Sequence, residues 1–312
     1  MKLLFSFLRL IRLKNLFFIA ITQVLFQYCV VNPIYLSDVV VFTNKLLSLL
    51  ILSSVFIAAG GYIINDYFDI DIDQINKPTK NVIDLVISRR WAMLLHSLFS
   101  LIGVLVSFYI GWKLGIWWLG IANFLTTVLL FFYSTTFKKK ALSGNIIISL
   151  LTAWSVALIG IATLYYNFTF QKNESIEANS KLFRITLLYA AFAFIISLIR
   201  EALKDMEDVK GDSKYGAKTM PVIWGMKATK VYIAVWIWVL IVAVFILEIY
   251  SLQFSWFWIT IYSFSVIIIP LLNILKSLFK ASEQSHFHRL SSLAKWVMLT
   301  GILSLLFFAY YL

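Results

Sequence analysis

Long apolar runs separated by short polar segments dominate this chain. Runs such as 46–64, 116–132 and 183–199 are nearly free of charge, and each approaches the ~20 apolar residues that a helix needs to cross a bilayer. The runs are too long and continuous for the alternating strands of an outer-membrane barrel, which leaves helices as the spanning structure. The pattern predicts nine spans, at 15–36, 45–65, 92–112, 115–134, 144–164, 183–204, 229–249, 255–275 and 293–312.

Composition agrees with this pattern. Of the 312 residues 61% are hydrophobic and only 13% are charged, whereas soluble chains carry about 25% charged residues. The mean hydropathy is +0.88. We therefore predict an all-α polytopic membrane protein. The basic start of the chain resembles a signal sequence, but no small-x-small cleavage site follows it promptly, so we expect a retained first helix.

The basic residues predict the orientation of the nine spans. If the N-terminus lies in the cytoplasm, 22 of the 27 Lys and Arg residues fall in cytoplasmic segments, as the positive-inside rule requires. The exceptions are Lys45, Lys113, Lys172, Lys181 and Arg184. We predict an integral protein of the plasma (inner) membrane. A basic face beside anionic lipid headgroups accounts for the net charge of +12, so no nucleic-acid partner is expected.

The acidic residues form two matching groups. Eight of the 15 lie in the segments 65-NDYFDIDID-73 and 205-DMEDVKGD-212, and Asp66, Asp69 and Asp73 each precede a second aspartate by 139 residues. This echo predicts two tandem four-helix halves, approximately 1–140 and 141–292, with a final helix at 293–312, within one domain covering 1–312. Four helices per half place both groups on the same membrane side, whereas an inverted repeat would place them on opposite sides.

Carboxylates in this arrangement need a partner. Asp66, Asp69 and Asp73 have i, i+3, i+7 spacing, as do Asp205, Asp208 and Asp212, so each set lies on one helical face. Like charges repel there, and carboxylates at a helix C-terminus oppose its dipole. Bound Mg²⁺ would relieve both effects, because it takes oxygen ligands and binds through carboxylates and substrate phosphates. The alternative is two solvated helix ends paired with local lysines.

Basic side chains near the two groups could bind the remaining phosphate charge. Lys77 and Lys80 follow the first group. Arg200 and Lys204 precede the second group, and Lys210 and Lys214 lie within or just after it. We predict that Lys77, Arg200, Lys204 and Lys210 contact a diphosphate and that Asn65 supplies a further oxygen.

The two aspartate motifs resemble those of the UbiA superfamily of intramembrane prenyltransferases, which join a polyprenyl diphosphate to a lipophilic acceptor. The segments 65-NDYFDIDIDQINKP-78 and 204-KDMEDVKGDSKYGAKTMPVIWG-225 are most similar to the digeranylgeranylglyceryl phosphate synthase branch. The resemblance implies Mg²⁺-dependent transfer of a geranylgeranyl group to a glycerol-phosphate lipid. It also implies that the six aspartates hold Mg²⁺ and that aromatic side chains near the motifs, Tyr133 among them, adjoin the substrate.

Other functions stay open at this point. The segment 77-KPTKNVIDLVISRR-90 departs from the basic, proline-rich stretch typical of the family, which leaves aromatic acceptors (4-hydroxybenzoate, dihydroxynaphthoate or homogentisate) or haem as alternatives. A cation transporter would place its carboxylates near the bilayer midplane, often at broken helices. The single motif of CDP-alcohol phosphotransferases is absent. A lipid-binding protein would bind the diphosphate without consuming it.

A few polar residues outside the motifs remain to be placed. Tyr133, Ser134, Gly144 and Asn145 flank the basic loop Lys138–Lys140, which is either a substrate-side loop or a membrane anchor. We expect His96, alone on a membrane helix, to be packed or hydrogen-bonded. His286 and His288 are expected to be solvated, and Glu248 to lie far from both motifs.

Overall fold

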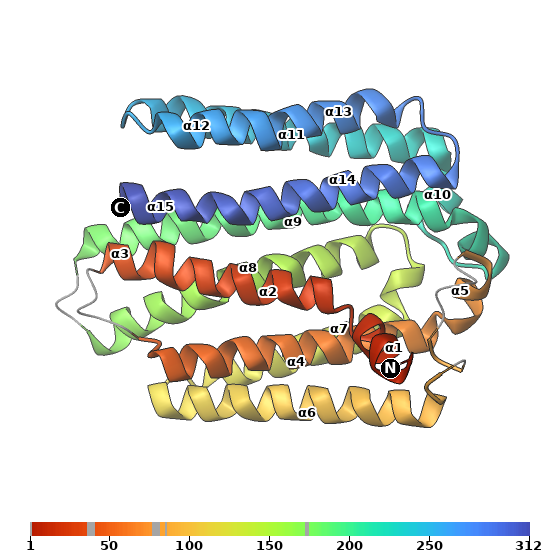
Figure 1. Ribbon diagram of the computed structural model, residues 1–312, viewed down its shortest axis with the longest axis horizontal. Helices are drawn as coiled ribbons and strands as arrows, with labels where there is room; N and C mark the ends of the chain where they lie inside the picture. The colour runs from red at the N-terminus through yellow and green to blue at the C-terminus, as the bar shows by residue number, and fades with distance from the viewer. Residues whose placement is uncertain (1, 36–40, 77–81, 85, 172–174) are drawn as a thin grey trace.

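The protein is a bundle of long helices that run side by side (Figure 1). The computed structural model describes residues 2–35, 41–76, 82–84, 86–171 and 175–312, and no strand longer than an isolated bridge forms within those residues. The nine predicted spans are confirmed in number and order among the described residues: Leu13–Ile34, Asn44–Phe68, Arg89–Leu114, Trp118–Thr135, Ser143–Phe170, Ile176–Lys214, Gly225–Leu252, Phe257–Leu278 and Gln284–Tyr311.

Eight of the described spans contain one long helix each; short elements extend the first and the last of these, and short elements alone form the span Phe257–Leu278. The long helices are α2 (Leu13–Phe26), α4 (Asn44–Phe68), α6 (Arg89–Leu114), α7 (Trp118–Thr135), α8 (Ser143–Phe170), α9 (Ile176–Lys214), α11 (Gly225–Leu252) and α14 (Gln284–Leu303). The shorter ones are α1 (Lys2–Leu10), η1 (Gln27–Val31), α3 (Asn32–Ile34), α5 (Ile70–Asn76), η2 (Phe137–Lys139), α10 (Met220–Ile223), α12 (Phe257–Ser263), η3 (Phe264–Ile268), α13 (Ile269–Leu278), η4 (Ser304–Phe307) and α15 (Phe308–Tyr311).

Several helices extend beyond the predicted spans. The sixth span was expected to end at residue 204, but α9 continues to Lys214, and α14 begins at Gln284 where residue 293 was expected. Hydropathy detects only the part of a helix that lies in hydrocarbon, so polar turns that project beyond it are missed. The second aspartate motif therefore lies within a continuous helix.

Two spans contain a π-helical turn just before a proline. Within the first span η1 precedes Pro33, and within the eighth η3 precedes Pro270. Proline has no N–H to donate and its ring crowds the preceding turn. A π-turn shifts the hydrogen-bond register, so the helix passes the proline without ending.

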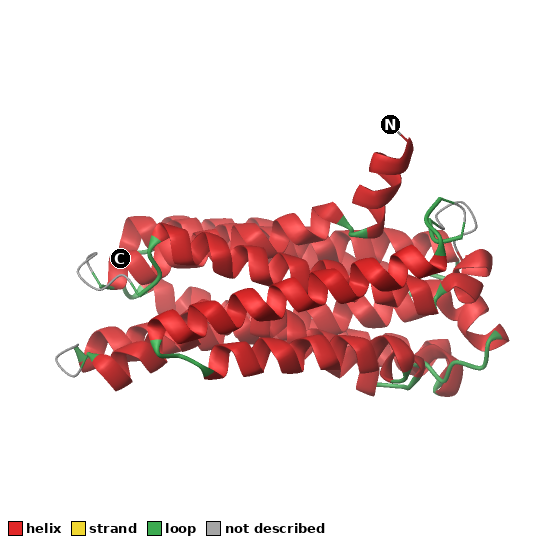
Figure 2. Ribbon diagram, turned by 90° about the horizontal axis from the view of Figure 1, so that it is seen from below, coloured by secondary structure: helices red, strands yellow, loops and turns green. Residues whose placement is uncertain are grey.

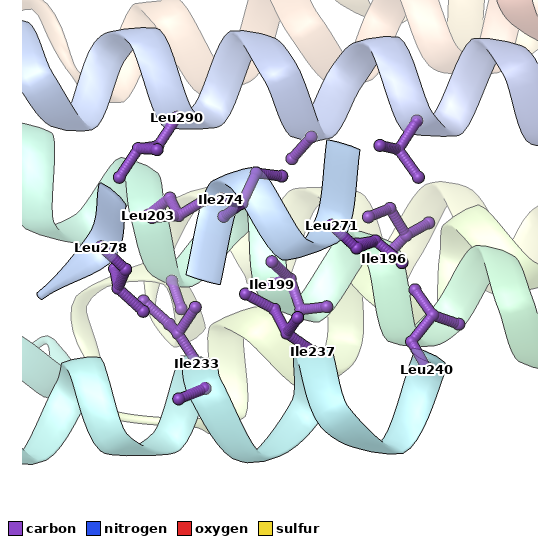
Figure 3. Close-up of a cluster of buried hydrophobic side chains, with 14 of the residues drawn as sticks. Ile196, Ile199, Leu203, Ile233, Ile237, Leu240, Leu271, Ile274, Leu278 and Leu290 are labelled. Atoms are coloured by element: carbon purple, nitrogen blue, oxygen red, sulfur yellow. The ribbon is translucent and has the colours of Figure 1, made fainter. Parts of the chain in front are cut away.

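A large apolar core joins the helices of the second half. Its side chains come from α9, α11, α13 and α14 and interdigitate in the close-up of Figure 3. Leu203, Ile233 and Ile274 are fully buried there. In a membrane such contacts gain dispersion energy and not hydrophobic free energy, so close fit decides which helix faces meet.

Small residues allow the closest helix approaches. A Cβ at Gly160 on α8 would lie 2.1 Å from the Thr186 hydroxyl oxygen on α9, so only glycine fits there. Similarly, a Cβ at Gly103 on α6 would lie 2.9 Å from the Ser53 carbonyl oxygen on α4. These two pairs, α4 with α6 and α8 with α9, are also the most extensively packed helix pairs of the described chain.

One end of the bundle collects the polar connections. Helices α5 and α10 lie at that end, and the C-terminus lies at the other (Figure 1). Helix α1 leaves the bundle at an angle near the same end (Figure 2). The turn between α1 and α2 is made by Arg12, which has the left-handed backbone angles φ 51° and ψ 53°. Both aspartate motifs lie at this end.

Candidate active site

The first motif spans the break between α4 and α5. Helix α4 ends at Phe68, Asp69 has φ −94° and ψ 0°, and α5 begins at Ile70. The expected unbroken helical face is therefore interrupted at its middle aspartate. The Asn65 amide nitrogen donates to Asp69 Oδ2 at 2.9 Å, which fixes the Asp69 carboxylate beside α4.

The second motif lies on the last turns of α9. Asp205 Oδ2 accepts a hydrogen bond from the Asn145 amide of α8 at 3.0 Å. Asp212 Oδ2 accepts one from the Thr219 hydroxyl at 3.2 Å. Each of these two carboxylates is thus held by a neutral donor from another segment, which leaves further lone pairs for a cation.

The two motifs line one cavity. Its volume is about 510 Å³, and Asn65 and all six predicted aspartates are among its lining residues. The predicted substrate residues Arg200, Lys204 and Tyr133 also line it. Helices distant in sequence thus bring their carboxylates to a single space, as the matched spacing predicted. The specific roles of these residues stay predictions.

Two predicted residues are not placed at the cavity. Lys210 is exposed on the outer surface of α9 and is not among the lining residues. The helical period explains this, because Lys210 is two residues from both Asp208 and Asp212 and so points away from their face. Lys77 lies outside the described residues.

Two cations that sequence reasoning did not assign to the site bind the first motif. Arg12 Nη2 contacts Asp66 Oδ1 at 2.5 Å, and its guanidinium lies 5.1 Å from the Tyr62 ring centre. Burial alone would lower the pKa of Arg12, but the Asp66 carboxylate outweighs it and raises that pKa above the ordinary arginine value. The left-handed turn at Arg12 thus holds a permanent charge at the cavity.

The second of these cations comes from the basic loop between α7 and α8. Lys138 makes an ion pair with Asp69, and both Lys138 and Lys139 line the cavity, whereas Lys140 is exposed. Burial disfavours the charge of Lys138, yet Asp69 more than compensates and raises its pKa. The loop therefore reaches the cavity, as expected for a substrate-side loop and not for a simple membrane anchor.

Arg200 and Lys204 share a carboxylate that the motif spacing does not include. Glu201 accepts from Arg200 Nη1 at 2.7 Å and from Lys204 Nζ at 3.0 Å, and it is 8% exposed. Glu201 lies four residues before Asp205, so it extends the acidic face of α9 by one turn. That i−4 position was the sequence signal that could have identified it.

His288 is solvent-exposed as expected, but it also has an acidic partner that is distant in sequence. Its side chain is 57% accessible, and its Nδ1 lies 2.8 Å from Glu207 Oε1. Glu207 belongs to the second motif segment, yet it faces α14 and is absent from the cavity lining. His96 fulfils its expectation, because it is buried and its Nδ1 lies 2.9 Å from the Gly60 carbonyl oxygen.

The donors in the cavity fit Mg²⁺. Asn65 Oδ1 is buried with no hydrogen-bond partner, although its side chain borders the carboxylates of the cavity. Within the described chain, no three His, Cys, Asp or Glu side chains converge to hold an ion by themselves. Hard oxygen donors in an incomplete set suit Mg²⁺, which usually takes one or two carboxylates together with substrate phosphates.

Fold and site together define an integral membrane protein with an acidic, cation-lined cavity at one end of a bundle of membrane-spanning helices. The model of the UbiA prenyltransferase family matches residues 24–299. The chain therefore belongs to that family, which confirms the resemblance drawn from the two motifs.

Curated relatives of similar sequence carry the name digeranylgeranylglyceryl phosphate synthase. Digeranylgeranylglyceryl phosphate synthase of Sulfurisphaera tokodaii is 36% identical over 65% of this chain and 66% of its own length. The enzymes of the same name from Methanosphaera stadtmanae and Methanothermobacter thermautotrophicus are 32% and 35% identical, over 55% and 58% of this chain. The alignments cover 56% and 57% of those two relatives, so this chain matches somewhat more than half of their length.

Solved structures share the fold. A structure concerned with digeranylgeranylglyceryl phosphate synthase in membranes is 22% identical, covers 100% of both chains and has a TM-score of 0.66. A UbiA homologue from Archaeoglobus fulgidus bound to DMAPP and Mg²⁺ is 16% identical, covers 96% of this chain and 99% of its own, and has a TM-score of 0.58.

Proposed function

We propose that this chain transfers a geranylgeranyl group from its diphosphate to the hydroxyl of geranylgeranylglyceryl phosphate, with Mg²⁺. The observation that carries the proposal is the meeting of both aspartate motifs in one cation-lined cavity. The names of the curated relatives support the choice of acceptor. The Mg²⁺ and DMAPP bound to a neighbour of the same fold support the choice of donor.

The polar end of the cavity would bind the diphosphate. Asp66, Asp69, Asp73, Asp205, Asp208 and Asp212, with Asn65, would hold Mg²⁺. Bound Mg²⁺ would neutralise the charge that develops on the leaving oxygens. Lys138 and Lys204 line the same space and would donate hydrogen bonds to the phosphate oxygens.

The apolar part of the cavity would hold the prenyl chain. Beyond the motifs the lining is mostly aliphatic and aromatic, which excludes water from the allylic carbon while the bond to oxygen breaks. These residues include Phe18, Ile57, Leu130, Phe192, Met298 and Leu305. In the reaction the bond from prenyl C1 to the diphosphate oxygen breaks, a bond from C1 to the acceptor oxygen forms, and the hydroxyl proton is released.

A second basic group supports an acceptor that carries phosphate. Arg9 of α1, Arg12 of the turn that follows it and Lys295 of α14 also line the cavity, whereas Lys138 comes from the loop between α7 and α8. Lys295 Nζ donates to Asn15 Oδ1 at 2.6 Å, so it is hydrogen-bonded to a neutral amide. An anionic headgroup at this position would lie beside the diphosphate without competing for the same cations.

The same proposal places the active site on the cytoplasmic side of the plasma membrane. The support is the excess of Lys and Arg in segments at the end of the bundle that carries the motifs. A water-soluble diphosphate head would then reach Mg²⁺ from the cytoplasm, while its tail stays in the bilayer.

The test is a transfer assay with purified protein in lipid vesicles, labelled geranylgeranyl diphosphate and Mg²⁺. The acceptors would be geranylgeranylglyceryl phosphate, 4-hydroxybenzoate, dihydroxynaphthoate and haem. We expect a doubly prenylated glyceryl phosphate that disappears when EDTA removes Mg²⁺. If a prenylated aromatic is the dominant product, the proposed acceptor is wrong. If none of the acceptors gives a product, the proposed transferase activity is wrong.

A further inference from the structure

Asn76, the last residue of α5, inserts its side chain into the backbone of α9. Its amide nitrogen donates to the Asp208 carbonyl oxygen at 3.0 Å, and its Oδ1 accepts from the Gly211 N–H at 2.9 Å. The side chain is 9% exposed. One amide thus makes both a donor and an acceptor contact with the turn of α9 that carries the second motif.

Gly211 provides the space for this contact. A Cβ at Gly211 would lie 2.5 Å from Asn76 Nδ2 and 2.6 Å from Asn76 Oδ1. Gly211 is helical and needs no unusual backbone angle. Glycine weakens a helix interior by about 1 kcal/mol relative to alanine. Its presence at position 211 is explained by the close approach of the Asn76 side chain.

The contact joins the two aspartate motifs directly. Asn76 follows Asp73 by three residues on α5, and on α9 it lies between Asp208 and Asp212. It also has no counterpart in the second half, where the position 139 residues later is the exposed Tyr215. The tandem pattern of aspartates therefore does not explain Asn76, and its function is specific to the junction of α5 with α9.

We propose that Asn76 is a positioning residue that sets the separation of the two carboxylate groups for Mg²⁺ and diphosphate. This inference rests on the proposed function. Without a cation the carboxylates of the two motifs repel each other, and the break at Asp69 separates the short helix α5 from α4, so its contact with α9 is what holds the two motifs together. A neutral amide suits this position, because it offers the donor and the acceptor that α9 requires without adding charge.

The variants that test the proposal are Asn76→Ala, Asn76→Asp and Gly211→Ala. The readouts are the Mg²⁺ concentration for half-maximal transfer and the rise in melting temperature that Mg²⁺ gives with a non-cleavable geranylgeranyl thiodiphosphate. We expect Asn76→Ala to raise the Mg²⁺ midpoint about 10-fold, as residues that orient metal ligands do. Asn76→Asp should be at least as defective, since it opposes the Asp208 carbonyl oxygen with a second acceptor.

Asn179→Ala is the matched control. Asn179 is a buried, hydrogen-bonded asparagine on the same helix α9 but at its other end, where the Tyr35 hydroxyl donates to it at 2.6 Å. This variant should lower the melting temperature without moving the Mg²⁺ midpoint. If Asn76→Ala behaves as Asn179→Ala does, Asn76 only stabilises the fold and the proposal is wrong.

The double variant Asn76→Ala/Gly211→Ala adds a second criterion. Gly211→Ala alone should raise the Mg²⁺ midpoint strongly, because its methyl group meets the Asn76 amide. Removal of that amide should bring the Mg²⁺ midpoint of the double variant back to that of Asn76→Ala. If the two substitutions instead raise the Mg²⁺ midpoint additively, the contact between Asn76 and Gly211 does not position the motifs and the proposal is wrong. The thermal readout does not require turnover, so it still tests Asn76 if the wild-type chain transfers no prenyl group.

Discussion

At the residue scale, the motif aspartates have different local partners. Asp66 is paired with Arg12 and Asp69 with Lys138, so two carboxylates are compensated by charge. Those of the second motif instead receive hydrogen bonds from neutral side chains, at Asp205 from Asn145 and at Asp212 from Thr219. A cation entering the cavity therefore competes with lysine and arginine on one side and with amide and hydroxyl donors on the other.

Removal of a central carboxylate from either motif is the first prediction. Asp69→Ala and Asp208→Ala should each lower transfer at least about 100-fold, because electrostatic stabilisation of the leaving group is lost. Rates in vesicles and the amount of inserted protein would be measured together. Asp71→Ala is the matched control, since Asp71 is exposed in the same segment and is not a lining residue. Full activity of either variant would contradict the assignment of the metal site.

The lysines of the basic loop give the second prediction. Lys138→Ala should raise KM for the prenyl diphosphate about 10-fold, because a charge-assisted hydrogen bond contributes roughly 1.5–3 kcal/mol. Steady-state kinetics at saturating Mg²⁺ would measure it. Lys140→Ala, two residues away on the exposed side of the loop, should leave KM unchanged. Equal effects of the two substitutions would mean that the loop acts only through its overall charge.

At the element scale, breaks and close contacts between helices shape the cavity. The left-handed turn at Arg12 separates α1 from α2, and the break at Asp69 separates α4 from α5. Each break lies at a charged residue that lines the cavity, Arg12 in the first case and Asp69 in the second. Helices α8 and α9 contribute by packing so closely that Asn145 reaches Asp205.

The third prediction concerns that packing. Gly160→Ala should destabilise the protein by about 1–3 kcal/mol, the usual range for an overpacked core, because its Cβ would meet Thr186 Oγ1 and Cγ2 at 2.1 and 2.8 Å. Thermal unfolding in detergent would show a lower melting temperature. Adding Thr186→Ala removes both atoms and should recover part of the loss. A Gly160→Ala variant as stable as the wild type would show that α8 and α9 can separate freely.

At the scale of the whole molecule, an odd number of spans leaves the termini at opposite ends of the bundle (Figure 1). The end with the N-terminal segment, α5 and α10 also carries both motifs. The tandem halves and the single domain remain predictions. One apolar cluster nevertheless draws Phe26, Leu119, Leu158 and Leu305 from spans along the whole chain.

Sidedness gives the fourth prediction. In a Cys29→Ala background, Lys210→Cys should react with a membrane-impermeant maleimide only from the cytoplasmic side, because α9 brings it to the end that bears the motifs. Lys181→Cys, exposed near the start of α9, should react only from the other side. Labelling of intact cells and of inverted vesicles would distinguish them. The reverse pattern would contradict the orientation.

The sequence by itself determined the spans found among the described residues and the six aspartates that line the cavity, and it predicts the orientation. Hydropathy and helical periodicity act over one or two turns, so they can be seen in the printed chain. The partners of those aspartates could not be found in that way, because Arg12 is 54 residues from Asp66 and Lys138 is 69 residues from Asp69. Asn76 is 132 residues from Asp208. Contacts at such separations depend on which helix faces pack together and on where α4 breaks, and only the tertiary structure decides these.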